Sequence, residues 1–198
     1  MATFGIDVDE VLRSLCSEMV KLYNREFNDC IEMDNLKDFD VDISFPRIKK
    51  KTGESASKWF FQEHGHELFY ESPALKGSVM AVNKLRQMGH QVYIISYQKS
   101  LANKLDTLRW LQRYEIEYDG ICFVKDKTII HLDYLIDDND WNFIKCNCKH
   151  GVLITAPYNK HIGLDLLHKV SNCETMERAN SLIDFVDKIE KCEKGEKK

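Results

Sequence analysis

Short apolar runs alternate along this chain with longer stretches in which apolar residues recur every three or four positions. Five short runs predict buried strands, at residues 3–8, 91–95, 120–124, 134–137 and 151–155. Helical spacing predicts four amphipathic helices, over residues 11–27, 79–88, 101–114 and 176–189. Strands that alternate with helices along the sequence predict an α/β fold with a mostly parallel sheet.

Residues 29–72 depart from this alternation. Their apolar residues are sparser, Lys49–Gly53 marks an exposed turn, and aromatic side chains gather between Trp59 and Tyr70. The stretch shows no strand-like alternation, so we expect it to be mainly helical. Because it interrupts the first strand–helix unit, it predicts a helical insertion after the first strand.

The composition is that of an ordinary globular protein, and it restricts the partners. Of the 198 residues, 43% are apolar and 30% are charged, which suits one large domain or one domain with a sizeable insertion. The net charge of -4 provides no basic field, so we expect no nucleic-acid polymer as a partner. No apolar run has the length of a membrane span and no signal sequence is visible, so we expect a cytoplasmic protein away from membranes. An oligomer is compatible with this composition.

Seven cysteines are spread along the chain. An odd number without a secretory signal argues against a disulfide framework. Cys146 and Cys148, with His150 nearby, could suggest zinc, but their spacing is not that of a usual structural site and no second cysteine pair follows. We therefore expect reduced thiols rather than zinc.

Two acidic pairs follow two of the predicted strands. Asp7 and Asp9 come at the end of the first strand, and Asp137 and Asp138 end the strand that begins at Tyr134. Ligands of open α/β sheets bind at the carboxyl edge of the strands, so the four carboxylates converge if these two strands are neighbours. Carboxylates at close range repel each other, and Mg²⁺ resolves the conflict because it prefers oxygen ligands. The sequence thus predicts a Mg²⁺-dependent enzyme that acts on phosphate.

Two further polar residues supply what phosphoryl transfer still needs. Asp7 can attack phosphorus to form an aspartyl-phosphate, and Asp9 can protonate the leaving oxygen and then deprotonate water. The hydroxyl and a backbone N–H near Ser96 can hold phosphate oxygens, and Lys127 can neutralise their charge. Their occurrence in this order favours catalysis far more than any one of them alone.

The order of these residues resembles the motifs of the haloacid dehalogenase (HAD) superfamily of phosphohydrolases. The resemblance implies a Rossmann-like core over residues 1–12 and 74–198, and a small helical cap over residues 13–73. It implies that Asp7 is the nucleophile and that Asp9 is the acid/base. Asp9 would also give its backbone carbonyl to the Mg²⁺.

The remaining motifs imply phosphate and metal ligands. Ser96 matches the second motif, and Tyr97 follows it at the implied phosphate site. Lys127 is our choice for the third motif, although Lys125 is also close. The second acidic pair matches the fourth motif and supplies metal ligands, of which Asp138 is preferred over Asp137.

Within the superfamily, the chain most resembles the 5'(3')-deoxyribonucleotidases and related bacterial nucleotidases. Three segments carry this resemblance, residues 126–128, 135–138 and 154–161. The chain departs from the family at Glu10, where glycine is usual, and at Tyr97, where a smaller hydroxyl residue is usual.

The resemblance implies a phosphomonoesterase that hydrolyses nucleoside monophosphates. Because buried aromatic side chains dominate cores, we expect the aromatic cluster from Trp59 to Tyr70 mainly in the core of the cap, and Trp59, Phe61 and Tyr70 are candidates to contact the base if one of them faces the site. A HAD phosphatase for a sugar phosphate or another small phosphoester would use the same chemistry under a different cap. A third alternative is a non-catalytic phospho-accepting or binding module. Receiver domains share the acidic cluster, hydroxyl and lysine, but their acidic pair comes first in the chain.

Overall fold

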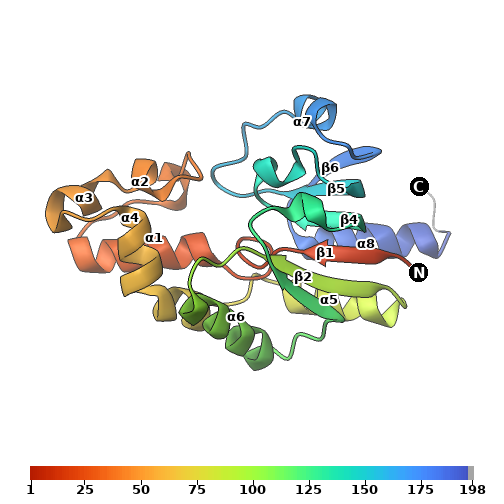
Figure 1. The fold of residues 1–198 in the computed structure, drawn as a ribbon, viewed down its shortest axis with the longest axis horizontal. Helices are drawn as coiled ribbons and strands as arrows, with labels where there is room; N and C mark the ends of the chain where they lie inside the picture. The colour runs from red at the N-terminus through yellow and green to blue at the C-terminus, as the bar shows by residue number, and fades with distance from the viewer. Residues whose placement is uncertain (196–198) are drawn as a thin grey trace.

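Six parallel strands form one sheet in the order β3-β2-β1-β4-β5-β6 in the computed structural model, which describes residues 1–195 (Figure 1). This is a doubly wound, Rossmann-like order, in which the topology reverses between β1 and β4. The two strands that precede the acidic pairs are therefore neighbours, as the sequence requires for a common site. The strands are β1 (Thr3–Ile6), β2 (Gln91–Ser96), β3 (Gly120–Phe123), β4 (Leu132–Asp137), β5 (Cys148–Ile154) and β6 (Thr175–Ala179).

Helices and short helical turns connect the strands. Those before β2 are α1 (Leu15–Phe27), η1 (Met33–Asn35), α2 (Val41–Ser44), α3 (Pro46–Thr52), α4 (Ala56–Lys58), η2 (Trp59–Glu63), η3 (Glu67–Glu71) and α5 (Ser78–Gln87). Those after β2 are α6 (Leu101–Arg113), η4 (Lys127–Ile129), η5 (Asp140–Phe143), α7 (Leu164–Val170) and α8 (Leu182–Glu193). Within residues 1–195, no helix has the length and apolar character needed to span a bilayer.

The two faces of the sheet bury two separate hydrophobic layers. Along β5, Val152 and Ile154 join a cluster with residues of α5, α6 and α8, while Leu153 joins a second cluster with residues of η5 and α7. Successive strand residues point to opposite faces, so a strand buried on both sides is apolar throughout. This explains why the central strands appear in the sequence as continuous apolar runs.

A third hydrophobic cluster lies beside the sheet, in the lobe that contains α1 to α4 (Figure 1). Its buried side chains come from residues between Leu15 and Phe69 and include Phe45, Ile48 and Phe60. Tyr158, from the segment after β5, also packs against this cluster. We call the segment from Leu15 to Glu71 the helical lobe.

The structure corrects two predictions for the first part of the chain. The helix predicted from residue 11 begins at Leu15, because the preceding residues form a loop in which the N–H groups of Leu12 and Arg13 both donate to the Val8 carbonyl. The predicted turn at Lys49–Gly53 is the last turn of α3, which Gly53 ends in the left-handed region with a φ of 79°.

The last predicted helix is also corrected. Met176 and Ala179 belong to the edge strand β6, and the helix begins only at Leu182, after the N-cap Ser181. The sequence did not reveal this strand because β6 is at the edge of the sheet and pairs only with β5. Its side chains are therefore half-buried or exposed, and its sequence is polar rather than a continuous apolar run. Helix α7 carries no long apolar stripe, and the sequence did not predict it.

Candidate active site

The two acidic pairs meet at the C-terminal edge of the sheet. Asp7 follows β1 directly, and its N–H continues the ladder by donating to the Ile136 carbonyl of β4 at 3.0 Å. Carboxylate oxygens of Asp7, Asp137 and Asp138 lie within 4.8 Å of one another, and all three residues are buried. The topology thus brings three of the four expected carboxylates into one cluster, whereas the Asp9 carboxylate is bound by other side chains.

Lys127 lies inside this acidic cluster. Its buried Nζ is 2.5 Å from Asp7 Oδ1 and 2.5 Å from Asp137 Oδ2. The short helix η4 positions it, and Asp126 caps that helix by accepting the Thr128 N–H at 2.9 Å. Lys125 is exposed on the rim of the same cleft. Of the two candidate lysines, Lys127 is the one that contacts the acidic cluster.

Asp137 and Asp138 have different surroundings. Both oxygens of Asp137 accept hydrogen bonds from Asn142, and they also accept from Lys127 and from the Asn139 N–H. Among residues 1–195, the Asp138 carboxylate accepts a hydrogen bond only from the Tyr158 hydroxyl, while Asn159 donates to the Asp138 backbone carbonyl. Asp138 therefore has more free acceptor capacity for a cation, whereas Asp137 is committed to protein donors.

Burial without enough positive charge changes the proton affinity of the cluster. Burial raises the pKa of Asp7 to about 7, against the opposing effect of Lys127. Burial, together with the charges of Asp137 and Asp7, raises the pKa of Asp138 well above its ordinary value. Burial disfavours the Lys127 ammonium, but the two carboxylates beside it outweigh this effect and raise its pKa. Protein charges alone thus leave the carboxylates short of positive charge.

The acidic cluster forms the floor of a cleft of about 1030 Å³ between the sheet edge and the helical lobe. Ser96, at the end of β2, is buried and lines this cleft, and Tyr97 beside it is 48% exposed. Apolar residues of the lobe form much of the opposite wall, among them Met19, Phe39 and Phe61. The cleft therefore combines a charged floor with an apolar roof.

The three candidate aromatic contacts occupy different places. Phe61 lines the cleft. Trp59 is buried in the helical lobe, with its ring packed against Phe60 and other aromatic rings. Tyr70 stacks on His66. Trp59 and Tyr70 are not among the residues that line the cleft, and the packing of their rings against protein side chains favours the place in the cap that the sequence predicted for most of this aromatic cluster.

Comparison with known proteins identifies the family of this chain. The model of the family described as 5' nucleotidase, deoxy (pyrimidine), cytosolic type C, matches residues 1–183. The chain belongs to this family. It is accordingly a hydrolase of phosphoric monoesters. A 5'(3')-deoxyribonucleotidase of Clostridium acetobutylicum is 31% identical over 163 residues, which cover 80% of this chain and 84% of the relative.

Solved structures of HAD proteins share the fold of this nucleotidase-family chain. A protein described as a predicted phosphatase from Clostridium acetobutylicum aligns with a TM-score of 0.62 at 15% identity, covering 96% of this chain and 98% of that one. A HAD hydrolase of Bacillus subtilis, solved bound to magnesium, aligns with a TM-score of 0.57 at 11% identity over 96% and 98% of the two chains. At such low sequence identities, the structural similarity is evidence for a shared fold alone.

Asp9 is held by two residues that the sequence reasoning missed. Arg13 donates to Asp9 Oδ1 through Nε at 2.9 Å and through a terminal nitrogen at 2.6 Å, and Gln98 donates to Oδ2 at 2.9 Å. The Arg13 side chain is fully buried and also donates to the Phe69 carbonyl, so it joins the Asp9 loop to the helical lobe. A charged residue inside the apolar stretch from Val11 to Leu15 was the available signal for Arg13.

Glu10, where the resemblance to the nucleotidases implies glycine as the usual residue, adopts a left-handed backbone with a φ of 55°. That region costs a side chain roughly 1–2 kcal/mol and costs glycine nothing, which explains the usual residue. Glu10 Oε1 accepts the Cys16 N–H at 2.6 Å, at the start of α1, where the N-cap Ser14 makes no side-chain hydrogen bond. Glu10 thus serves as the acceptor for the first turn of α1.

Proposed function

We propose that this chain is a Mg²⁺-dependent nucleotidase that hydrolyses nucleoside monophosphates through an aspartyl-phosphate on Asp7. The observation that carries the proposal is the buried cluster of Asp7, Lys127 and the second acidic pair at the floor of the cleft. A nucleophile, a counter-charge and metal ligands are thereby present at the switch point of the sheet, where α/β proteins bind ligands.

Asp7 is oriented for attack. Its Oδ1 accepts from Lys127 and its Oδ2 accepts the Asp9 N–H at 3.1 Å, which fix the rotation of the carboxylate. A new bond from an Asp7 oxygen to phosphorus forms while the bond from phosphorus to the nucleoside oxygen breaks. Lys127 limits the repulsion between this carboxylate and the negatively charged phosphate.

Asp9 lies two residues on and can move the protons of both steps. It gives a proton to the departing nucleoside oxygen, and it then takes a proton from the water that attacks the phosphorus of the aspartyl-phosphate. That second attack releases inorganic phosphate and restores Asp7. Arg13 and Gln98 hold the Asp9 carboxylate at the edge of the cleft, so they are positioning residues in this scheme.

The donor set of the acidic cluster fits a hard divalent cation. Asp7 and Asp138 offer carboxylate oxygens that lie close together, and burial leaves these groups short of positive charge. Oxygen ligands from one or two carboxylates, completed by waters and substrate phosphate, are what Mg²⁺ prefers in proteins. The backbone carbonyl of Asp9 is our third candidate ligand. When bound, Mg²⁺ would neutralise the phosphate charge and the nucleophile's charge.

A nucleotide suits the cleft better than a small phosphoester. The cleft is large, and the wall opposite the acidic cluster presents apolar side chains, including the ring of Phe61. Aromatic rings stack on nucleobases. The relatives described as deoxyribonucleotidases support this choice of substrate class. We propose that the helical lobe, together with residues 13 and 14 and 72 and 73, acts as a cap over the bound nucleoside.

A phosphate-release screen tests the proposal. Deoxyribonucleoside monophosphates, ribonucleoside monophosphates and sugar phosphates are compared at equal concentration, with Mg²⁺ and with excess chelator. We expect higher kcat/KM for nucleotides than for sugar phosphates, and no turnover in chelator. Full activity in chelator would contradict the metal, a preference for sugar phosphates would favour the general phosphatase, and binding without any turnover would favour the phospho-binding module.

A further inference from the structure

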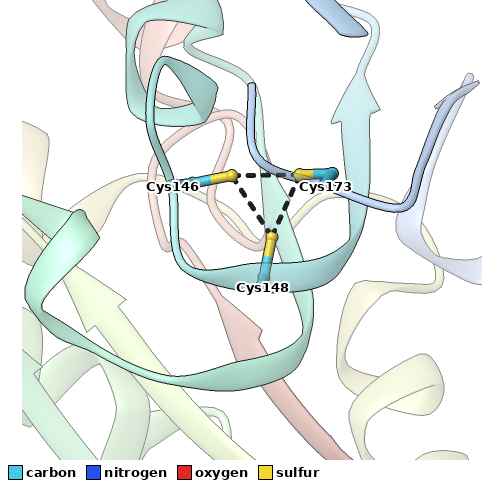
Figure 2. A group of neighbouring side chains, drawn as sticks. All are labelled: Cys146, Cys148 and Cys173. Atoms are coloured by element: carbon cyan, nitrogen blue, oxygen red, sulfur yellow. Dashed lines mark hydrogen bonds between the residues drawn. The ribbon is translucent and has the colours of Figure 1, made fainter. Parts of the chain in front are cut away.

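Three cysteine side chains converge at the opposite edge of the sheet from the acidic cluster. Cys146 precedes β5, Cys148 is its first residue, and Cys173 lies between α7 and β6. The Sγ atoms of Cys146 and Cys173 are 3.0 Å apart, those of Cys148 and Cys173 are 3.3 Å apart, and those of Cys146 and Cys148 are 3.4 Å apart. Figure 2 shows the three sulfur atoms directed toward a common centre.

This cluster differs from ordinary buried cysteines. A reduced cysteine usually packs as a small apolar group among other apolar groups. Here all three residues are buried, none is in a disulfide, and each sulfur contacts the other two. The sulfur–sulfur separations are shorter than the optimum of about 3.5–4.0 Å for contact between two carbon atoms, although sulfur is the larger atom. The arrangement therefore places three potential metal-ligand atoms around one point.

The triangle of sulfur atoms is close to the size that a zinc ion requires. A Zn–S bond is about 2.3 Å long, so tetrahedral coordination places sulfur ligands about 3.8 Å apart. Each sulfur would have to move outward by only about 0.3 Å to reach that geometry. Thiolates are soft ligands that select zinc, whereas the acidic cluster offers hard oxygen ligands that select Mg²⁺. The two sites therefore differ in the metals they prefer.

The ligand atoms that lie within 4.8 Å of one another are those of the three cysteines, so a fourth ligand has to move in from a neighbouring side chain. His168 is near the end of α7, and its Nε2 lies 3.0 Å from the carbonyl oxygen of Cys173. His150, which the sequence brings closest to Cys148, has its Nδ1 at 2.8 Å from the Thr175 hydroxyl and its ring packed against Tyr134. His168 is thus the better placed imidazole.

We propose that Cys146, Cys148 and Cys173 bind one structural Zn²⁺, with His168 as its fourth ligand. A site with three cysteines and one histidine is among the common structural zinc sites. Binding converts the three thiols to thiolates and releases three protons to solvent, with neutral imidazole completing the shell. No oxidant or reductant is needed.

The site ties two loops together and takes no part in the phosphatase chemistry. It links the segment before β5 to the loop before β6. Two backbone hydrogen bonds already connect this region, because the Lys145 N–H donates to the Val170 carbonyl and the Glu174 N–H donates to the Lys149 carbonyl. Cys148 is in register with Leu132, five residues before Asp137 on β4. At about 3.3 Å per residue, this places the zinc roughly 16 Å from the acidic cluster.

Metal analysis and cobalt substitution test the proposal on the full chain. The protein is purified with a reductant and without chelator, exchanged into metal-free buffer on a desalting column, and analysed for zinc by mass spectrometry. We expect about one zinc per chain, because structural zinc sites bind with about 10–16 kcal/mol. Reconstitution with Co²⁺ should give a thiolate-to-metal charge-transfer band, which cobalt bound only to carboxylates would not produce.

Three variants complete the test. Cys173→Ser should lose the zinc and the cobalt band, while Cys192→Ser, at an exposed cysteine of α8, should retain both. His168→Ala should weaken zinc retention, and unchanged retention would overturn the assignment of the fourth ligand. If Cys173→Ser fails to fold, the wild-type chain still decides the question. The proposal is overturned if the purified wild type contains no zinc and thiol titration finds all seven cysteines reactive. It is also overturned if the zinc-free protein has five reactive thiols because two cysteines form a disulfide.

Discussion

The substitution Glu10→Gln should make stability less dependent on pH. Burial raises the pKa of Glu10 from 4.5 to about 7 in the folded chain, partly opposed by the hydrogen bond from the Cys16 N–H. Glutamine at this position is neutral at every pH and keeps an acceptor oxygen for that N–H. The comparison therefore isolates the cost of a buried charge at the start of α1.

The sign and the size follow from proton linkage. Between pH 4.5 and about 7 the folded chain holds a proton on Glu10 that the unfolded chain has released, so rising pH lowers the free energy of unfolding. One pKa unit corresponds to 1.36 kcal/mol, so the whole shift costs the wild type about 3 kcal/mol at most. For a chain of this length, that difference corresponds to a Tm change of roughly 6–12 °C.

Thermal or urea unfolding at a series of pH values measures this effect. The stability of Glu10→Gln minus that of the wild type should be near zero below pH 4.5, rise toward pH 7 and stay constant above about pH 8. Glu115→Gln is the matched control, because Glu115 also has a left-handed backbone, with a φ of 52°, but is exposed. A difference that does not change with pH, or the same pH profile in the control, would refute the reasoning.

Four further predictions concern the proposed chemistry and the helical lobe. Asp9→Asn should lower kcat by about 10²-fold or more, the usual scale for the loss of an acid/base, and near-normal turnover would exclude that role. Phe61→Ala should lower kcat/KM for nucleotides by roughly 5- to 150-fold through lost stacking. By contrast, Trp59→Ala should mainly lower stability, by about 3–5 kcal/mol, because its ring is buried in the helical lobe. Mg²⁺ at about 100 times its Kd should raise the free energy of unfolding by about 2.7 kcal/mol, and a rise that persists in Asp138→Asn would contradict that ligand.

The sequence predicted the central sheet because strands buried on both faces are apolar without interruption. The run that contains β1 and the run that contains β4 were visible for this reason, and the acidic residues that follow them located the cluster. The edge strand β6 was missed because its sequence, from Thr175 to Ala179, is polar. Met176 and Ala179 also happen to have helical spacing relative to the apolar residues of α8, so local periodicity favoured the wrong element.

Contacts between distant residues explain what the sequence could not reveal about the site. Gln98 reaches Asp9 across 89 positions of the chain, and Tyr158 reaches Asp138 from the segment after β5. Neither residue belongs to a local pattern that signals its partner. Cys173 likewise joins Cys146 across 27 positions, which is why a cysteine pair judged incomplete in the sequence has a third member in the fold.

The most direct test of the proposed mechanism is phosphate release from a deoxyribonucleoside monophosphate by the wild type and by Asp7→Asn, both in Mg²⁺. Asparagine has the shape of aspartate, but its amide lacks the charged oxygen that attacks phosphorus. Thermal unfolding of the two proteins checks that the variant is folded. The account predicts Mg²⁺-dependent release by the wild type and none above background by folded Asp7→Asn. Release by the variant at a rate near that of the wild type would contradict an aspartyl-phosphate on Asp7.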